Sequence, residues 1–165
     1  MTLQTFLPYP NFYKSASCLD KKRLNCQIKE ANQIINIILR KMKIKRDGKK
    51  GWLNHPVLKI WSDKDGKYYL KQLIDYTDAM WIMADILGID NKTWLKRRYK
   101  ILVTYRKHEN KFGKEGLIKW SRKFHDTIKA NLIRKDEKHY NKYFKNNKIK
   151  PKEGYIWEHC KLCLK

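Results

Sequence analysis

Apolar residues that recur every three or four positions between Asp20 and Lys43 constrain the fold of this chain more than any other feature. They are Leu24, Ile28, Ala31, Ile35, Ile38 and Met42. This spacing places them on one face of an α-helix. Ser17 with Asp20 three residues later fits a capping box, so we expect Ser17 to be the N-cap of this helix and the helix to end at about Lys43. A helix with such a stripe must pack against other elements to bury it.

The segment before this helix has a different character. Residues 3–13, LQTFLPYPNFY, are rich in aromatic side chains and are interrupted by Pro8 and Pro10. Proline lacks a backbone N–H and disrupts helices. We therefore expect residues 1–16 to form an extended N-terminal arm that lies over the core.

Helical patterns continue through most of the remaining chain. They cover a short helix that starts at Pro56, residues 68–87 with Gly88 as a C-cap, residues 91–106, and residues 117–144 with an interruption near His125 or Asp136. No segment shows the alternating pattern of a β-strand. We predict an all-α fold: a compact single-domain bundle of four or five helices over residues 1–165, with an extended C-terminal tail at 146–165.

The charge of the chain indicates its partner. The sequence holds 39 Lys and Arg against 16 Asp and Glu, a formal net charge of +23 that is spread from end to end. A biased codon usage can replace Arg by Lys, but it does not explain the scarcity of acidic residues. Nucleic acid is the partner that this charge favours, with an acidic protein or an anionic membrane surface as alternatives.

Neither a membrane span nor a secretory signal is indicated by the sequence. No apolar run reaches 18 residues, and Pro8 and Pro10 interrupt the early apolar stretch. We expect an intracellular protein, not inserted in a membrane, whose four cysteines (Cys18, Cys26, Cys160 and Cys163) are free thiols. His159, Cys160 and Cys163 supply three possible zinc ligands, but a structural zinc site takes four. We therefore expect no bound metal, and keep a zinc-dependent interaction module as an alternative.

Glu30 is an unusual residue for a helix that binds a polyanion. The first 46 residues contain ten Lys or Arg and only two acids, Asp20 and Glu30. On a helical wheel Glu30 lies about 100° from the centre of the apolar stripe, at the edge of the core. A partly desolvated carboxylate in this position can act in acid/base or electrostatic catalysis. The alternative is that it partners Arg23, Gln27 or Lys41 on the same helix.

Thr2 is a second candidate for chemistry. It is small enough for Met1 to be removed, which would expose its α-amine. An α-amine has a pKa of about 7.7–8.0, so part of it is a neutral nucleophile near pH 7. Most proteins with a small second residue make no use of it.

Asn54 and His55 precede the short helix at Pro56, and His125 lies in HDTIKANLIR. Helix N-termini favour phosphate through their free N–H groups. Plain N-capping by Asn54 or His55 explains the first pair equally well.

Several blocks of this sequence, taken together, resemble a known family. QTFLPYPNFYKSASCLDKKRLNCQIKEANQI, GWLNHPVLKIW, FHDTIKANLIRKDEKHY and GYIW occur in order between Gln4 and Trp157 and cover about half of the chain. They are similar to successive blocks of the pyrimidine-dimer DNA glycosylase family, and the QTFLPYP opening resembles its bacterial members. Two differences stand out: Arg23 occupies a position where the phage pattern has His, and Thr2 and Leu3 precede the opening motif.

The resemblance implies a monomeric all-α repair enzyme that binds double-stranded DNA, kinks it and flips out a nucleotide. It implies excision of a damaged or modified pyrimidine, with a cyclobutane pyrimidine dimer as the first candidate, followed by β-elimination as an AP lyase. In that family the nucleophile is the exposed N-terminal amine and a Glu on the first long helix assists, which corresponds to Thr2 and Glu30 here. No cofactor is required by this chemistry.

The resemblance and the charge together suggest the residues that contact DNA. These are Lys22, Arg23, Lys29, Asn54, His55, His125, Lys129, Arg134 and Lys135. The aromatic segment that contacts the lesion in the phage member has only loose counterparts here, in Tyr140-Tyr143-Phe144 and Tyr155-Trp157. The alternative is a basic DNA- or RNA-binding protein of the same fold that has no catalytic activity.

Overall fold

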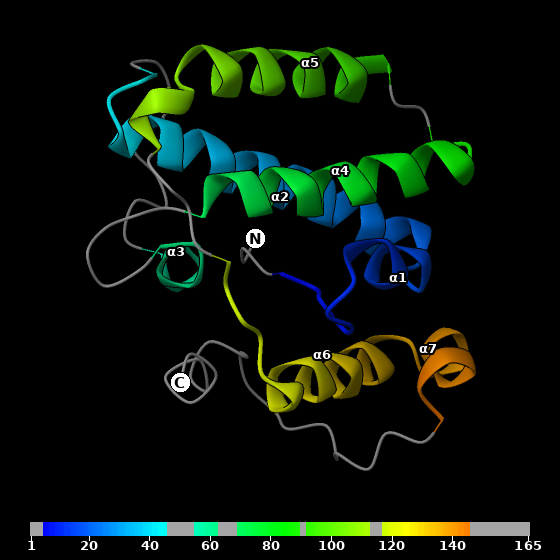
Figure 1. Cartoon of the computed structure of the whole chain (residues 1–165). Coiled ribbons are helices and arrows are strands. Elements are labelled where there is room, and N and C mark those ends of the chain that lie inside the picture. Colours follow the sequence, from blue (N-terminus) through cyan, green and yellow to red (C-terminus); the bar gives the residue numbers. More distant parts are fainter. Residues whose placement is uncertain (1–4, 46–54, 63–68, 90–91, 113–116, 146–165) are drawn as a thin grey trace.

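The computed structural model describes residues 5–45, 55–62, 69–89, 92–112 and 117–145 (Figure 1). Its helices are α1 (Phe12–Ser17), α2 (Lys21–Lys41), α3 (Pro56–Ile60), α4 (Leu70–Ile86), α5 (Lys92–Lys107), the 3₁₀-helix η1 (Glu109–Lys111), α6 (Arg122–Lys135) and α7 (Glu137–Phe144). These residue ranges contain no β-strand. The all-α prediction is therefore confirmed.

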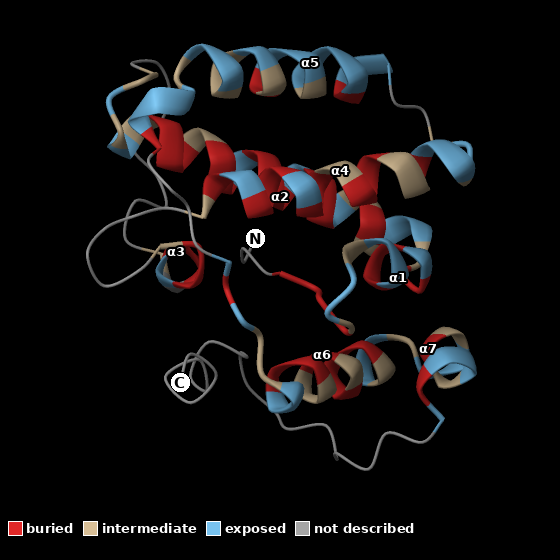
Figure 2. Cartoon of the chain, in the orientation of Figure 1, coloured by how far each residue is buried: buried red, intermediate tan, exposed pale blue. Residues whose placement is uncertain are grey.

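The α2 and α4 helices pack against each other and form the centre of the structure. The predicted stripe of α2 faces this interface, where Leu24, Ile28, Ile35 and Ile38 are completely buried. Burying such a side chain contributes roughly 1.5–3 kcal/mol each. Figure 2 shows buried residues along both helices, whereas α5 is mostly exposed. This pair is the scaffold on which the N-terminal part of the chain is placed.

The first long helix begins later than its sequence suggests. Asp20, not Ser17, is the N-cap of α2, and its Oδ1 accepts a hydrogen bond of 3.0 Å from the Arg23 N–H. Ser17 instead ends α1, a short helix inside the segment that we predicted as an arm. Asn11 caps α1 by accepting from the Lys14 N–H at 2.8 Å. A local side-chain cap was thus enough to start a helix directly after Pro10.

The C-terminal helical region divides at Asp136. This residue ends α6 and also caps α7, because its Oδ1 accepts a hydrogen bond of 3.0 Å from the His139 N–H. His125, the other predicted break, lies within α6. The division of this region and the extra helix α1 explain why the structure has more helices than the four or five predicted.

Two helices end in the same backbone motif. Gly88 follows α4 with φ +63°, and the N–H groups of Gly88 and Ile89 donate to the carbonyls of Asp85 and Ala84 at 3.0 and 2.9 Å. This confirms the predicted cap. Lys43 follows α2 in the same left-handed conformation, with φ 56°. A lysine there is less favourable than glycine because its Cβ crowds the backbone.

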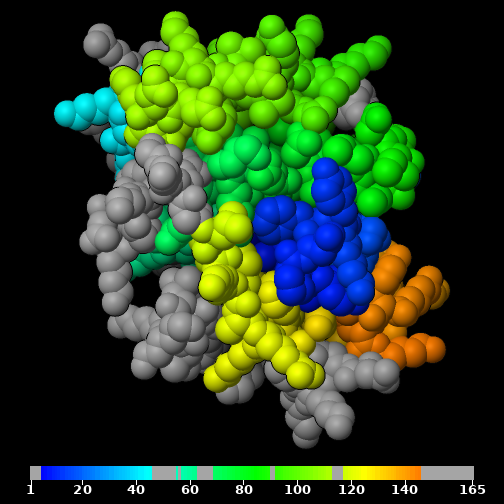
Figure 3. Space-filling view, in the orientation of Figure 1, coloured from blue at the N-terminus to red at the C-terminus, as the bar shows by residue number. Residues whose placement is uncertain are grey.

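Residues 5–10 are not helical and run between the α2–α4 pair and α6 (Figure 1). Thr5, Phe6 and Leu7 are buried, with 2%, 4% and 0% of their surface exposed. Figure 3 shows this segment and α1 between α4 and the C-terminal helices α6 and α7. In the described part of the chain, no helix is both long and apolar enough to span a membrane. The predicted tail at 146–165 lies outside the described residues.

Candidate active site

A buried hydrogen-bond network links Glu30 to the N-terminal segment. The Gln27 side chain lies one turn before Glu30 on α2, and its Nε2 donates to Glu30 Oε2 at 3.0 Å. Gln27 Oε1 accepts from the Phe6 N–H at 2.8 Å and from the Tyr76 hydroxyl at 2.6 Å. The Tyr76 hydroxyl also lies 3.2 Å from the Phe6 carbonyl oxygen. One amide side chain therefore connects the carboxylate, the N-terminal backbone and α4.

The network is shielded from solvent. Glu30 is 7% exposed, Gln27 1% and Tyr76 1%. Burial raises the pKa of Tyr76 well above its usual value, and the nearby charge of Glu30 adds to this effect. The Tyr76 hydroxyl therefore keeps its proton and can donate it to Gln27 or to the Phe6 carbonyl oxygen. Glu30 lies deeper than the edge of the core that its wheel position predicts, because residues 5–10 cover this side of α2.

Two further side chains hold the same segment. The Trp61 indole N–H donates to Thr5 Oγ1 at 3.2 Å, and His125 Nδ1 lies 2.7 Å from the Leu7 carbonyl oxygen. The contact with a carbonyl requires the proton to be on Nδ1. Desolvation lowers the pKa of His125, so the ring is neutral near pH 7. The backbone of residues 5–7 is thus tied to α2, α4, α6 and the end of α3.

Cationic side chains from α2 and from the C-terminal end of α6 lie near Glu30. Arg23 Nη2 donates to the Lys135 carbonyl oxygen at 2.9 Å, which joins α2 to α6. Desolvation lowers the pKa of Lys135, the charges of Arg23 and Arg134 lower it further, and Glu30 opposes them. The Lys135 ammonium also lies 5.8 Å from the centre of the Phe6 ring. The structure thus brings together three predicted residues, Arg23, Glu30 and Lys135, and Arg134 precedes Lys135 on α6.

Arg23 is held by groups beyond its own helix. Its Nη1 lies 2.6 Å from Asp20 Oδ2, which also accepts from the Tyr140 hydroxyl at 2.6 Å. Burial opposes ionisation of Asp20, but the hydrogen bonds from Tyr140 and Arg23 outweigh it and lower the pKa of Asp20. The Asp20 carboxylate therefore stays ionised and fixes the guanidinium near Lys135.

The other predicted site residues are distributed differently. Lys22 is exposed on α2, and Lys29 is exposed on a neighbouring face that looks toward α5. Lys129 Nζ binds Asp126 at 2.8 Å. His55 caps α3, since its Nδ1 accepts from the Val57 N–H at 3.2 Å. Thr2 and Asn54 lie outside the described residues.

His125 contrasts with these exposed cations. It is 4% exposed and contacts the Leu7 backbone. Its geometry favours holding the N-terminal segment over direct contact with a phosphate.

No group of three or more possible metal ligands occurs among the residues that the structure describes. Of the four cysteines, Cys18 is buried and Cys26 is exposed. Burial raises the pKa of the Cys18 thiol to about 12, so it is inert near neutral pH. His159, Cys160 and Cys163 lie outside the described ranges, so the zinc alternative stays a prediction.

Sequence reasoning missed the groups that organise the site. Gln27 was considered only as a partner of Glu30, and Tyr76, Trp61 and Thr5 were not considered at all. A glutamine next to the apolar stripe, three residues before an isolated carboxylate, is the one local signal that points to a buried polar pair. Nothing in the sequence around Tyr76 distinguishes its hydroxyl from that of any other core tyrosine.

Comparison with known proteins gives one match. A family model described as pyrimidine dimer DNA glycosylase matches residues 3–96, which is more than half of the 165 residues. The matched region holds α1 to α4, Gln27, Glu30 and Tyr76, and it ends near the start of α5. No significant match was found among curated proteins or solved structures.

Proposed function

Because this chain belongs to the pyrimidine dimer DNA glycosylase family, we propose that it excises damaged pyrimidines from double-stranded DNA and then cleaves the strand as an AP lyase. A cyclobutane pyrimidine dimer is the proposed substrate, and the protein acts as a monomer. The proposed catalytic residues are the α-amine of Thr2, exposed by removal of Met1, and Glu30.

The observation that carries the proposal is the link between Glu30 and the N-terminal backbone. Two hydrogen bonds, of 3.0 and 2.8 Å through the Gln27 side chain, join the Glu30 carboxylate to the Phe6 N–H. Two residues, Leu3 and Gln4, separate Thr5 from Thr2, and three Cα–Cα steps span at most ~11 Å. The backbone of residues 5–7, held beside Glu30, therefore supports Thr2 as the residue that supplies the amine.

The chemistry assigns one role to each group. As the glycosidic bond breaks and the base leaves with its electrons, the neutral Thr2 amine forms a bond to C1′ of the sugar. Ring opening gives an iminium ion, which acidifies the C2′ proton. Loss of that proton forms a double bond and expels the 3′ phosphate, and water then hydrolyses the imine and restores the amine.

Glu30 is suited to stabilise the positive charge that develops on the sugar. Its carboxylate is 7% exposed, and an ion in such a weakly polar environment interacts more strongly with a nearby charge than it would in water. The same carboxylate can take part in the proton transfers of ring opening and elimination. We propose that Arg23, Arg134 and Lys135, together with Lys22 on α2, contact the phosphates around the flipped nucleotide. Lys29 and Lys129 would contact the backbone farther out.

Borohydride trapping tests the nucleophile. With a duplex that contains an abasic site, reduction should join the strand covalently to the N-terminal residue of the protein. Acetylation of the N-terminus, or a form that retains Met1, should abolish the adduct. An adduct of unchanged yield after blocking would show that another amine is the nucleophile.

A second candidate function, favoured by the charge of +23 alone, is non-catalytic binding of DNA or RNA. Glu30→Gln separates the two, with Glu109→Gln as a control at an exposed glutamate. An enzyme should lose strand cleavage in the first variant while its affinity for DNA is retained or increased, and the control should be unchanged. A protein whose wild type cleaves neither dimer-containing nor abasic duplex would fit the binding function.

A further inference from the structure

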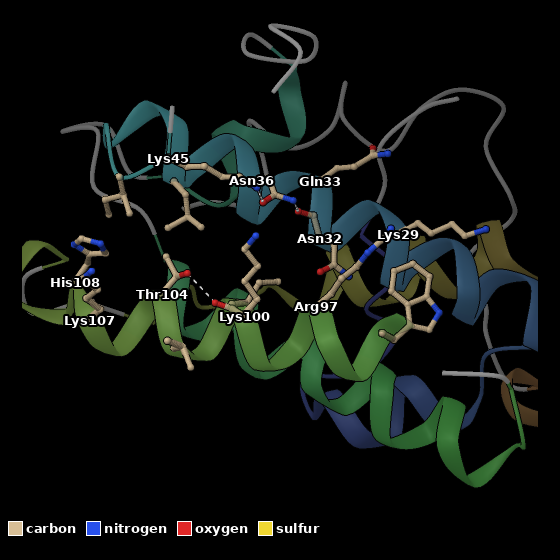
Figure 4. A pocket seen from close by; sticks show the side chains of 15 residues that line it. Lys29, Asn32, Gln33, Asn36, Lys45, Arg97, Lys100, Thr104, Lys107 and His108 are labelled. Carbon is tan, nitrogen blue, oxygen red and sulfur yellow. Dashed lines mark hydrogen bonds between the residues drawn. The ribbon is translucent and has the colours of Figure 1, made fainter. Parts of the chain in front are cut away.

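A groove of about 920 Å³ separates α2 from α5 (Figure 4). It lies on a different side of α2 from the Glu30 network, and the family match ends near the beginning of α5. Apolar side chains such as Leu39 and Ile101 contribute to its lining, and most of its polar residues are cations and amides. Lys29 lies at the edge of this groove, and the other described residues assigned to the catalytic site do not line it.

Four of the seven cations on α5 gather on one face. At about 100° per residue, Lys96, Arg97, Lys100 and Lys107 fall within a sector of roughly 100°. The α5 sequence contains no acidic residue to neutralise them. Arg97 is positioned by Trp94, since its guanidinium lies 4.8 Å from the centre of the ring. Lys100 and Lys107 line the groove and are exposed.

The facing wall on α2 is also a donor surface. Lys29, Gln33 and Asn36 recur at helical spacing along it, and Lys45 Nζ binds Asn36 Oδ1 at 2.9 Å. Figure 4 shows these side chains and those of α5 on the two sides of the groove. Among the described residues, those that line the groove include no acidic side chain. Two walls of like charge repel each other unless anions lie between them.

We propose that the groove between α2 and α5 binds the phosphate backbone of one strand of the same duplex that reaches Glu30. Charge complementarity favours a polyanion, and amide and lysine donors suit phosphate oxygens. This inference rests on the proposed function, because it takes the Glu30 side of α2 as the site of the damaged strand.

The geometry of α2 explains how one duplex reaches both places. Glu30 lies about 100–120° around the helix axis from Lys29 and Asn36, and the exposed residues Cys26 and Gln33 lie between these two directions. The exposed strip of α2 that holds Cys26 and Gln33 therefore connects the two places, and one duplex that lies along this strip can contact both.

The test is a salt titration of binding to an undamaged duplex. Lys100→Gln/Lys107→Gln removes two cations from the groove, and Lys119→Gln/Lys123→Gln removes two equally exposed cations that do not line it. Both variants lose the same net charge and should fold, which thermal melting checks. Each lost phosphate contact should reduce the slope of log K against log salt by about 0.9, so the groove variant should lose about 1.8. If the wild type and the groove variant bind equally at 1 M salt, the groove variant should bind about 30-fold more weakly than the wild type at 0.15 M salt.

Equal slopes and affinities for the two variants would overturn the proposal, since the effect would then be one of net charge alone. Loss of binding to polyglutamate in the groove variant only, with DNA binding equal to the control, would assign the groove to an acidic protein and would also overturn it. The titration uses undamaged DNA and does not depend on cleavage. Failure of borohydride trapping would therefore refute the proposed chemistry, and the salt titration would still test the groove.

Discussion

Gln27 is the residue whose replacement tests the organisation of the site most directly. It is 1% exposed and makes three hydrogen bonds, to Phe6, Tyr76 and Glu30. Gln27→Met keeps nearly the same size and shape and removes all three. The variant therefore separates the polar network from the packing of α2 against its neighbours.

The expected cost follows from what each partner loses. The buried Phe6 N–H is left without its acceptor, at about 1–3 kcal/mol, and the loss of a hydrogen bond to the charged Glu30 adds about 1.5–3 kcal/mol. The Tyr76 hydroxyl keeps the Phe6 carbonyl oxygen at 3.2 Å, so it adds little. We expect the free energy of unfolding to fall by about 3 kcal/mol, at the lower end of this sum, because the methionine is apolar and suits a buried position. Tyr76→Phe should cost less, about 1 kcal/mol.

Urea denaturation measures this change, and borohydride trapping on an abasic duplex measures its consequence. Because Gln27 no longer joins the Phe6 backbone to Glu30, the rate of trapping should fall about tenfold or more under conditions where the variant is fully folded. Gln33→Met is the matched control for the denaturation measurement, since Gln33 is exposed on the same helix and should change stability by less than about 0.5 kcal/mol. A cost for Gln27→Met below about 1 kcal/mol, or an unchanged trapping rate, would refute the role of this network.

Three further predictions concern stability. Burial lowers the pKa of His125 below its ordinary value of 6.5, so the folded state binds fewer protons than the unfolded state. The contribution of His125 to the free energy of unfolding is present above pH ~6.5 and is lost as the pH falls toward the folded-state pKa. The urea midpoint should therefore be lower at pH 5.0 than at pH 7.5, and this difference should be smaller in a His125→Gln variant. Lys43→Gly should raise and Gly88→Ala should lower the free energy of unfolding by about 1 kcal/mol each, because both positions have positive φ; thermal melting would contradict this if both changes had the same sign. Tyr140→Phe removes a hydrogen bond of 2.6 Å that keeps Asp20 ionised, so it should raise the pKa of Asp20 and move acid unfolding to higher pH, and an unchanged acid midpoint would refute that role.

The periodic parts of the fold were predictable because they depend on local spacing. The apolar stripe of α2, Pro56 at the start of α3 and Gly88 after α4 were all identified from their neighbours in sequence. The start of α2 was predicted wrongly at Ser17, because a capping box and a single capping aspartate give similar patterns over a few residues. The sequence pattern was equally compatible with a break at Asp136 and with one at His125. The hydrogen bond from the His139 N–H to the Asp136 side chain starts α7 and puts the break at Asp136.

The candidate site was predictable only in part. Glu30 stood out because an acid is unfavourable on a basic helix, and Arg23, Arg134 and Lys135 were expected to contact DNA from the resemblance and the charge. Their actual convergence depends on α6, whose residues are more than 100 positions away along the chain. No spacing rule links positions so far apart, so the contact between Arg23 and the Lys135 carbonyl could not be derived from the sequence.

The sequence by itself determined the helical class, the cationic character and the isolated carboxylate of this protein, because these follow from local periodicity and from composition. The tertiary structure decided that Glu30 is buried and joined through Gln27 to the backbone of Phe6. It also decided that α5 faces α2 across a groove lined with cations. Both results depend on which surfaces the packing of distant helices covers and which it leaves open, and that is a property of the whole fold.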